Sequence, residues 1–395
     1  MSSFLCGARH DTLARFTANC YNRFMAKKRD SLPLHQQVYR SLERDIYAAR
    51  WRPGERMPSE AELVRDFGVS RITVARALRD LQSAGLVDRR AGSGTYVSTR
   101  LAARDGLSFG LLIPDLGDTE IFEAICQGMM ASPLAREHAL LWGPAAVAEE
   151  AREASAWALC RQYVERSVDG VFFAPLEFTP QKDEANRRIA RSLDEAGIPI
   201  VLLDRPVAPY PDRGLHDLVG INNRQAGYVI TEHLVSAGAR RIAFVGMRHT
   251  AATVDARESG YREALYHAGL PVVAGLMRRL DPASTTEVRA LMEAERPDGI
   301  VCANDRTAGR LMHTLLDLGY TVPDEVRIVG IDDLDYAKLL PVSLTTFRQP
   351  TREIGAAALA AMLDRVAQRE RATRDILLHG ELVVRRSCGA SMLED

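Results

Sequence analysis

The chain has 395 residues and a formal net charge of −1, with 51 Lys and Arg against 52 Asp and Glu. This length allows two or three domains with sizeable cores, and no apolar run approaches the length of a membrane span. Six scattered cysteines form no C-x-x-C pair and no histidine stands at zinc-site spacing, so we expect reduced thiols in a cytoplasmic protein without a metal site.

The charge is divided unevenly along the chain. Residues 1–100 contain 18 Lys and Arg against 10 Asp and Glu, whereas the remaining residues contain 33 against 42. A basic N-terminal quarter on an acidic body favours a head that binds nucleic acid. Residues 1–30 lack the continuous apolar segment of a secretory signal, and we expect them to be disordered or an over-long gene start.

Residues 59–83 are predicted to form two helices joined by a tight turn. The first begins at Ser59, Gly68 can take the positive φ of a turn, and Ser70 can cap the second helix. The inward face of the second helix is apolar and consists of Val74, Ala77, Leu78 and Leu81. Its opposite face carries Arg71, Thr73 and Arg76. This pattern is typical of a helix-turn-helix, whose second helix can enter the major groove of DNA.

Residues 85–97 are predicted to form a β-hairpin with a glycine-rich turn. Arg89 and Arg90 lie at its tip, and alone they would be interpreted as solvated surface charge. After a helix-turn-helix, however, a basic hairpin is typical of a wing that grips DNA. We therefore predict a winged helix-turn-helix DNA-binding domain over residues 31–98.

Residues 33–98 resemble the winged helix-turn-helix of GntR-family transcription regulators. The resemblance rests on stretches such as Pro53-Gly54-Glu55-Arg56-Met57-Pro58-Ser59-Glu60, Gly68-Val69-Ser70-Arg71-Ile72-Thr73-Val74 and Gly92-Ser93-Gly94-Thr95-Tyr96-Val97. Together with the pattern above, it implies a DNA-binding set of Ser59, Ser70, Arg71, Thr73, Arg76, Arg90, Gly92, Gly94 and Thr95. The chain departs from the family at Ala61 and Ala75, where arginine is common.

After a stretch without periodicity at 99–107, expected to be a linker, short apolar runs alternate with helical stretches. The runs occupy residues 109–114, 170–175, 198–204, 218–222, 242–246, 299–304 and 326–332. The helical stretches occupy residues 121–130, 186–196, 225–237, 260–268 and 308–318. Strands that are apolar throughout and alternate with helices indicate parallel sheets covered on both faces. No G-x-G-x-x-G follows a strand and no Walker A sequence occurs, which disfavours a nucleotide-binding fold.

Four polar residues close these apolar runs, namely Asp204, Asn222, Asn304 and Asp332. In open α/β sheets, ligands bind in the crevice outside the carboxyl ends of the strands. Arg257, at the start of a predicted helix, can reach the same space. Any one of these residues is more often a cap or a loop hydrogen bond, but together they suit a sugar or a similar polar molecule.

Residues 108–390 resemble the effector domain of the LacI/GalR family, which shares the fold of periplasmic sugar-binding proteins. The most specific stretches are Val329-Gly330-Ile331-Asp332-Asp333 and Leu344-Thr345-Thr346-Phe347-Arg348-Gln349. The resemblance implies two α/β lobes joined by three crossings, one of them near residues 344–346. It also implies that Asp204, Arg257, Asn304 and Asp332 contact the effector, with Asp118 and Thr119 at the mouth of the cleft.

Other classes of protein are disfavoured. Nine histidines form no metal motif, no G-x-S-x-G nucleophile elbow is present, and the adjacent Asp332 and Asp333 are more often a cleft residue and a cap than a catalytic pair. A regulator dependent on pyridoxal phosphate would need a Schiff-base lysine, and after Lys28 only Lys182 and Lys338 remain. A solute receptor for a transporter would have no DNA-binding head.

The fold class is thus multi-domain α/β, with an N-terminal winged helix-turn-helix and a two-lobed periplasmic-binding-protein-like domain of parallel sheets. This order of domains resembles that of arabinose-repressor-like regulators. We expect a homodimeric repressor without cofactor or membrane association, which leaves double-stranded operator DNA when a sugar-like effector binds. An activator, or a co-repressed regulator with an effector such as a nucleoside, remains an alternative.

Overall fold

The computed structural model describes residues 33–47, 50–51, 54–83, 85–90, 93–98, 106–114, 120–143 and 151–390. The chain divides into two compact units between Asp105 and Gly106. The expectation for residues 1–30 and most of the linker at 99–107 fall outside the described residues. Within the described ranges, no helix is long and apolar enough to cross a membrane.

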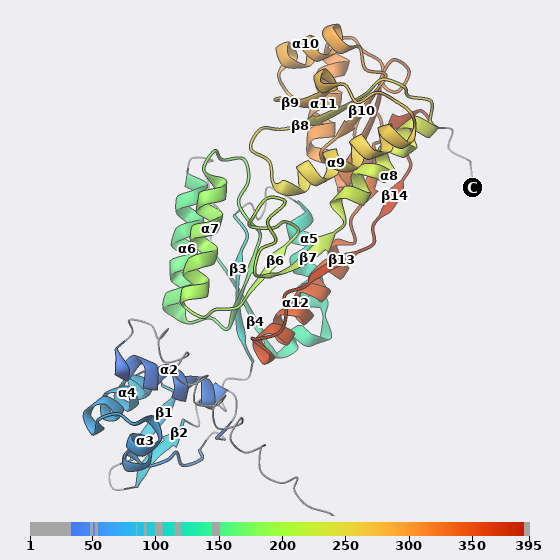
Figure 1. The fold of residues 1–395 in the computed structure, drawn as a ribbon. Coiled ribbons are helices and arrows are strands. Elements are labelled where there is room, and N and C mark those ends of the chain that lie inside the picture. The colour runs from blue at the N-terminus through green and yellow to red at the C-terminus, as the bar shows by residue number, and fades with distance from the viewer. Residues whose placement is uncertain are drawn as a thin grey trace, which may run out of the picture. The chain divides into compact units, whose positions relative to one another are not determined.

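The described residues of the first unit form a head of three helices with a two-stranded wing (Figure 1). Its elements are α2 (Leu34–Tyr47), α3 (Glu60–Phe67), α4 (Arg71–Ser83), β1 (Val87–Arg90) and β2 (Gly94–Val97). The core gathers Leu42 from α2, Leu63 from α3 and Leu78 from α4, each less than 3% exposed. The antiparallel pair Val87 and Val97 closes this core from the hairpin. The predicted helix-turn-helix and wing are confirmed.

The described residues of the second unit form two six-stranded sheets. The first has the order β13-β7-β6-β5-β3-β4 and is parallel throughout. Its strands are β3 (Ser108–Leu112), β4 (Ala139–Trp142), β5 (Gly170–Phe173), β6 (Ile200–Leu203), β7 (Asp217–Ile221) and β13 (Asp375–Leu378). The second has the order β14-β12-β11-β10-β8-β9 and is parallel except for β14. Its strands are β8 (Ile242–Gly246), β9 (Met277–Arg279), β10 (Gly299–Cys302), β11 (Arg327–Asp332), β12 (Thr345–Arg348) and β14 (Glu381–Val383).

All seven predicted apolar runs are strands, and all seven lie inside the sheets. The strands that were not predicted are β4, β9, β12, β13 and β14. Four of these are sheet edges with one or more exposed positions. The strands β9, β13 and β14 each include a charged residue, whereas β4 is a short apolar run that the sequence analysis did not single out.

The helices cover the sheets in pairs. The pairs are α5 (Glu120–Ala131) with α12 (Thr351–Ala367), α6 (Arg152–Arg166) with α7 (Lys182–Glu195), α8 (Asn223–Ser236) with α9 (Ala252–His267), and α10 (Thr285–Glu295) with α11 (Asp305–Asp317). On β5, Phe172 packs toward α5 and α12 while Phe173 packs toward α6 and α7, so the two sides of this sheet are covered by different pairs (Figure 1). The sequence did not predict α6, α10 or α12, and α9 begins eight residues before the predicted start at 260.

The chain passes between the two sheets three times, because β7 leads into α8, β12 leads into α12, and β13 leads into β14. The crossing expected near residues 344–346 lies slightly later, because Thr345 and Thr346 still belong to β12 and pair with β11. Gln349 and Pro350 make this connection.

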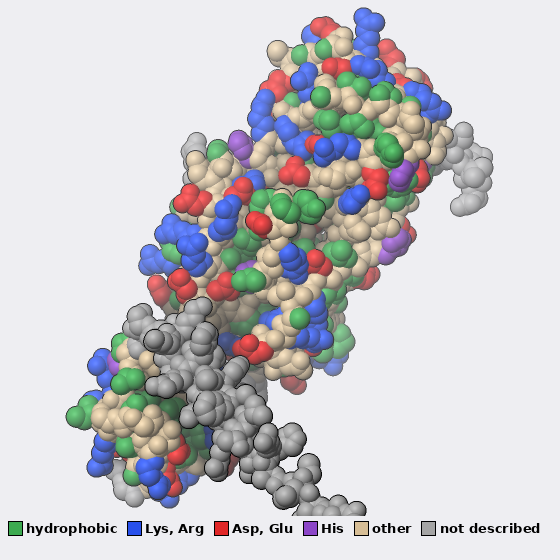
Figure 2. Space-filling model, viewed as in Figure 1, with side chains coloured by type: hydrophobic (Ala, Val, Ile, Leu, Met, Phe, Trp, Pro, Cys, Tyr) green, Lys and Arg blue, Asp and Glu red, His purple; other side chains and the backbone are tan. Residues whose placement is uncertain are grey.

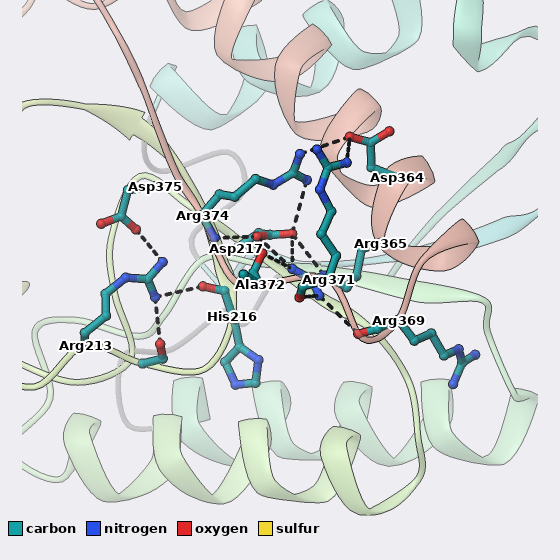
Figure 3. A network of polar contacts seen from close by, with 11 residues as sticks. Arg213, His216, Asp217, Asp364, Arg365, Arg369, Arg371, Ala372, Arg374 and Asp375 are labelled. Carbon is teal, nitrogen blue, oxygen red and sulfur yellow. Dashed lines mark hydrogen bonds and ion pairs between the residues drawn. The ribbon is translucent and has the colours of Figure 1, made fainter. Parts of the chain in front are cut away.

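A buried ionic network holds β13, the strand that precedes the third crossing, in place (Figure 3). Asp217, at the start of β7, is fully buried and accepts hydrogen bonds from Arg365 NH2 on α12 at 3.0 Å to each carboxylate oxygen. The backbone N–H of Arg374, just before β13, donates to the same carboxylate at 2.7 Å. Arg374 also reaches Asp364 at 3.0 Å. One buried carboxylate thus joins β7, α12 and the start of β13.

On the face drawn in Figure 2, basic and acidic side chains are interspersed over the second unit. That face offers no large patch of one sign to a polyanion such as DNA.

Candidate DNA-binding surface and effector cavity

Two serine caps shape the helix-turn-helix. The side chain of Ser59 accepts from the backbone N–H of Glu62 at 3.3 Å, and the Glu62 carboxylate accepts from the N–H of Ser59 at 2.7 Å. Gly68 ends α3 with a left-handed φ of 62°. Ser70 Oγ accepts from the N–H of Thr73 at 3.3 Å and shares a 2.8 Å hydrogen bond with its hydroxyl. Both serines of the predicted DNA-binding set are therefore engaged in setting the direction of the helices.

Glu60 connects α4, which we call the recognition helix, to the wing. Its carboxylate lies 3.4 Å from Arg71 Nε and 2.5 Å from Arg89 NH2. The Arg71 side chain nevertheless remains 80% exposed, and Arg76 is exposed on the same helix. Sequence reasoning missed Glu60 because its partners are 11 and 29 residues away.

The predicted DNA-binding residues of the wing differ in how accessible they are. The Arg90 guanidinium stacks over the ring of Tyr96 at 4.5 Å from the centroid. Gly94 has a φ of 122°, a conformation that L side chains rarely adopt. A Cβ at this position would stand 2.9 Å from Arg56 Nε, so the Arg56 side chain lies against this part of the wing. Thr95 is only 8% exposed, which leaves little of it accessible to DNA. Gly92 lies outside the described residues.

A cavity of about 380 Å³ opens at the carboxyl ends of the strands of both sheets in the second unit. Asp204 reaches it from the end of β6, Arg257 from α9, Asn304 from the end of β10 and Asp332 from the end of β11. The structure thus brings together four residues that are far apart in sequence, as parallel strand ends do. The predicted residues Asp118 and Thr119 lie outside the described residues.

Arg257 is held by groups on three sides of the cavity. It is 4% exposed, its Nε donates to Asn223 Oδ1 at 2.7 Å, and its NH1 donates to the carbonyl of Ala303 at 2.7 Å. Its NH2 lies 3.7 Å from Asp332 Oδ1. The prediction placed Arg257 at a helix start, but it lies in the second turn of α9, which begins earlier than its sequence pattern indicated.

Asp332 is a buried carboxyl group in an unusual backbone conformation. It ends β11 with a φ of 129° and accepts a hydrogen bond from Gln349 Nε2 at 2.7 Å. Burial raises the pKa of Asp332 to about 8 although Arg257 opposes the shift, and nearby Asp305 adds to the rise. Gln349 belongs to the second crossing, so this carboxyl group joins the cavity to the connection between the sheets.

Asp204 places a buried carboxyl group in the wall of the cavity. It is 5% exposed, has a φ of 66°, and its Oδ1 has no hydrogen-bond partner among the described residues. Burial raises its pKa, opposed by the charges of Arg205 and Arg257. A buried acceptor without a donor costs about 1–3 kcal/mol, so this oxygen is suited to receive a donor from a ligand.

Two asparagines at strand ends behave differently. Asn304 Oδ1 caps α11 by accepting from the N–H of Thr307 at 2.9 Å, and Asn304 also lines the cavity, where its amide nitrogen can donate. Asn222 caps α8 by accepting from the N–H of Gln225 at 3.1 Å, but it is exposed and does not line the cavity. Its neighbour Asn223, the buried first residue of α8, contacts Arg257 instead.

The adjacent carboxylates Asp332 and Asp333 face different surroundings. Arg348 Nε and Arg385 NH2 each donate to Asp333 at 2.6 Å. Although burial opposes the shift, these hydrogen bonds hold the pKa of Asp333 below its ordinary value. The two carboxyl groups do not form a pair around one reacting atom.

Sequence reasoning missed several residues of the cavity wall. Glu177 and Arg205 form a buried ion pair, and the Arg205 guanidinium lies 5.1 Å from the ring centroid of Phe122. Arg205 follows Asp204 directly and could have been found with it, whereas Glu177 lies in a loop without a motif. The other missed residues of the wall with polar side chains are Thr253, Arg306, Arg310, His313 and Tyr336. Across the part of the chain that the structure describes, no group of three metal-ligating side chains occurs.

A winged helix-turn-helix in the same chain as a two-lobed α/β unit with a polar cavity defines the class of ligand-responsive DNA-binding regulators. Comparison with known families agrees with this class. Residues 34–97 match the bacterial regulatory proteins of the gntR family, and residues 231–388 match the periplasmic binding protein-like domain. The chain therefore combines a gntR-family helix-turn-helix with a periplasmic binding protein-like domain.

Individual relatives support the same assignment. The chain is 28% identical over 371 residues to the arabinose metabolism transcriptional repressor of Geobacillus stearothermophilus, covering 91% of this chain and 99% of that protein. It is 30% identical over 232 residues to the HTH-type transcriptional repressor PurR of Vibrio campbellii, covering 58% of this chain and 66% of that protein. The transcription regulator GntR of Chromobacterium violaceum has a crystal structure similar to 72% of this chain and 100% of its own, with 28% identity and a TM-score of 0.57.

Proposed function

We propose that the chain is a repressor that leaves its operator when a small polyhydroxylated effector, a sugar or sugar derivative, binds in the cavity of the second unit. The domain combination and the two relatives that are named as transcriptional repressors support the regulatory part. The arabinose metabolism repressor matches almost the whole chain, which supports a sugar as the class of effector. The observation that carries the proposal is the Oδ1 of Asp204 in the wall of the cavity, which has no hydrogen-bond partner among the described residues.

The hydrogen-bonding groups of the cavity suit a molecule with several hydroxyl groups. Asp204 offers an acceptor, Asn304 offers N–H donors, and Arg257 with Asp332 offers donors and an acceptor side by side. A hydroxyl group donates one hydrogen bond and accepts others, so adjacent hydroxyls can satisfy acceptor and donor groups together. The ring of Phe122 and the side chain of Val254 provide apolar surface for the carbon skeleton.

Each sheet of the second unit with its helices forms one lobe, and effector binding is proposed to close the two lobes on the ligand. The wall of the cavity comes from both sheets, and the lobes are joined by the three crossings, which can act as hinges. The unliganded and closed states would then differ in affinity for DNA by a coupling free energy of about 1–3 kcal/mol. A homodimer would place two heads on the half-sites of a palindromic operator and transmit this difference.

The proposal is tested by measuring binding of pentoses, hexoses, sugar phosphates, polyols and nucleosides to the full chain by calorimetry. We expect one sugar class to bind, and Asp204→Asn to weaken that binding by at least tenfold because the amide replaces an acceptor oxygen with donors. Asp212→Asn, an exposed carboxylate away from the cavity, is the matched control. Absence of binding by every sugar, or equal affinity in Asp204→Asn, would overturn the sugar assignment.

A further inference from the structure

One large apolar side chain of the recognition helix points away from the core. Ile72, the second residue of α4, is 79% exposed, whereas the core residues Val74, Leu78 and Leu81 of the same helix are fully buried. Single exposed apolar residues are common on protein surfaces, so exposure alone carries no function. The position of Ile72 in the fold is what distinguishes it.

Ile72 lies on the face of α4 that is available to DNA. At 100° per residue, it shares a stripe with Ala75, Arg76 and Arg79, and both arginines are exposed. Arg71 adjoins it on the same exposed side and is tethered to Glu60. An apolar side chain thus stands among three cations, next to an alanine too short to cover it. This surface is therefore complementary to a polyanion that exposes an apolar group between its negative charges.

Major-groove DNA has such a group. The edges of the bases there present donors, acceptors and one apolar substituent, which is the C5-methyl group of thymine. Residues at the N-terminal end of the second helix of a helix-turn-helix contact base edges. We propose that Ile72 is a specificity-determining residue that packs against a thymine methyl group in the operator. This inference rests on the proposed binding of operator DNA and adds the identity of one base contact.

The test removes the thymine methyl group and the Ile72 side chain, first separately and then together. The full wild-type chain first selects its preferred duplex from a pool of randomised DNA, and each thymine of that duplex is then replaced by deoxyuracil. We expect one replacement in the half-site to weaken wild-type binding about fourfold, the factor that corresponds to ~0.8 kcal/mol for burial of one methylene-sized group. Ile72→Ala should bind the thymine and deoxyuracil duplexes equally, because the contact is already lost.

Two further variants keep the result interpretable. Ile72→Val retains a branched side chain and should retain most of the discrimination. Leu34→Ala removes a 57% exposed leucine from α2 of the same unit and should leave the discrimination unchanged. Alanine favours a helix more than isoleucine does, so Ile72→Ala should remain folded, which circular dichroism checks.

The possible failures are distinguishable. If no duplex is enriched by the wild-type chain, operator binding itself is overturned and the role of Ile72 with it. If a duplex is enriched but no deoxyuracil substitution weakens binding, or the loss persists undiminished in Ile72→Ala, the methyl contact is overturned while DNA binding stands.

Discussion

Gly227 of α8 lies directly against the backbone of Arg257 in α9, so that a Cβ on Gly227 would stand 2.0 Å from the carbonyl oxygen of Arg257. Gly260 of α9 approaches Arg224 of α8 in the same way, at 1.9 Å from its carbonyl oxygen. The two helices therefore pack backbone to backbone. This packing sets the depth at which the Arg257 guanidinium enters the cavity.

Gly227→Ala is expected to push α9 away from α8 and to displace Arg257. Overpacking of this kind costs about 1–3 kcal/mol of unfolding free energy, and we expect effector affinity to fall at least tenfold in addition. Gly355→Ala is the control, because its Cβ would stand 2.0 Å from the carbonyl of Ile125 in the other lobe. It should lower the melting temperature similarly while effector affinity, measured by calorimetry, changes little. Equal affinity loss in both variants would contradict a specific role for the α8–α9 contact.

Arg257→Ala should separate effector response from DNA binding. The side chain contacts Asn223 and lies beside Asp332 in the cavity, and it belongs to a different unit from the recognition helix. We expect the variant to bind the selected operator with wild-type affinity and to remain bound when effector is added, in an electrophoretic or anisotropy assay. Normal release by effector would show that Arg257 is not part of the effector site.

Arg71→Ala should have the opposite effect. Its side chain is 80% exposed at the start of α4, and loss of a cation that contacts phosphate or a base should weaken operator binding by at least tenfold. If the contact is to phosphate, the slope of log K against log salt concentration should also fall by about 1. Arg161→Ala, which removes an exposed arginine of the second unit, should change neither quantity. Unchanged operator affinity in Arg71→Ala would remove this residue from the interface.

The stability of the second unit should depend on pH through Asp332. Because burial raises the pKa of this carboxyl group to about 8, the native state keeps a proton that the unfolded state releases near pH 4. Between these values the unfolded state binds fewer protons, so the unfolding free energy contributed by this group falls as pH rises. Above about pH 8 both states are ionised and the contribution no longer changes.

Asp332→Asn removes this titration. Melting temperatures measured from pH 5 to pH 9 should therefore fall less steeply with pH in the variant than in the wild type. Asp305, whose pKa burial raises to about 6, interacts with Asp332, so the two curves are compared above about pH 7, where Asp305 is ionised in both proteins. Parallel curves for wild type and variant would mean that Asp332 is already ionised at neutral pH in the native protein.

Asp217→Asn should strongly destabilise the second unit. The substitution leaves the buried Arg365 without its carboxylate, and breaking a buried ion pair typically costs about 3–5 kcal/mol. Asp375→Asn breaks the exposed pair with Arg213 and should cost less than about 1 kcal/mol. Denaturant unfolding of both variants measures the difference. A small loss in Asp217→Asn would mean that the network in Figure 3 does not hold β13 in place.

The sequence by itself was sufficient to predict the central strands and the helix-turn-helix with its wing, because both depend on patterns of neighbouring residues. The runs that became β5, β6, β8 and β10 are buried on both faces and read as continuous apolar segments. The helix-turn-helix depends on caps and apolar spacing within a few residues, and Ser59, Gly68 and Ser70 take the conformations that these signals predict. The edge strands β13 and β14 are only half buried and combine a charged residue with two or three apolar ones, so their patterns carried little information.

Only the tertiary structure decided which polar residues share the cavity. Asn222 and Asn304 both follow strands and both cap helices, yet only Asn304 faces the cavity, because that depends on how the helix leaves the sheet. Glu177 in the cavity wall and Glu60 in the first unit form ion pairs with arginines that the fold brings to them from distant segments. The sequence thus determined which chemical groups stand at the ends of the strands, through local periodicity and turn chemistry. Their distances, their burial and the unsatisfied oxygen of Asp204 arise from long-range packing, which no local pattern encodes.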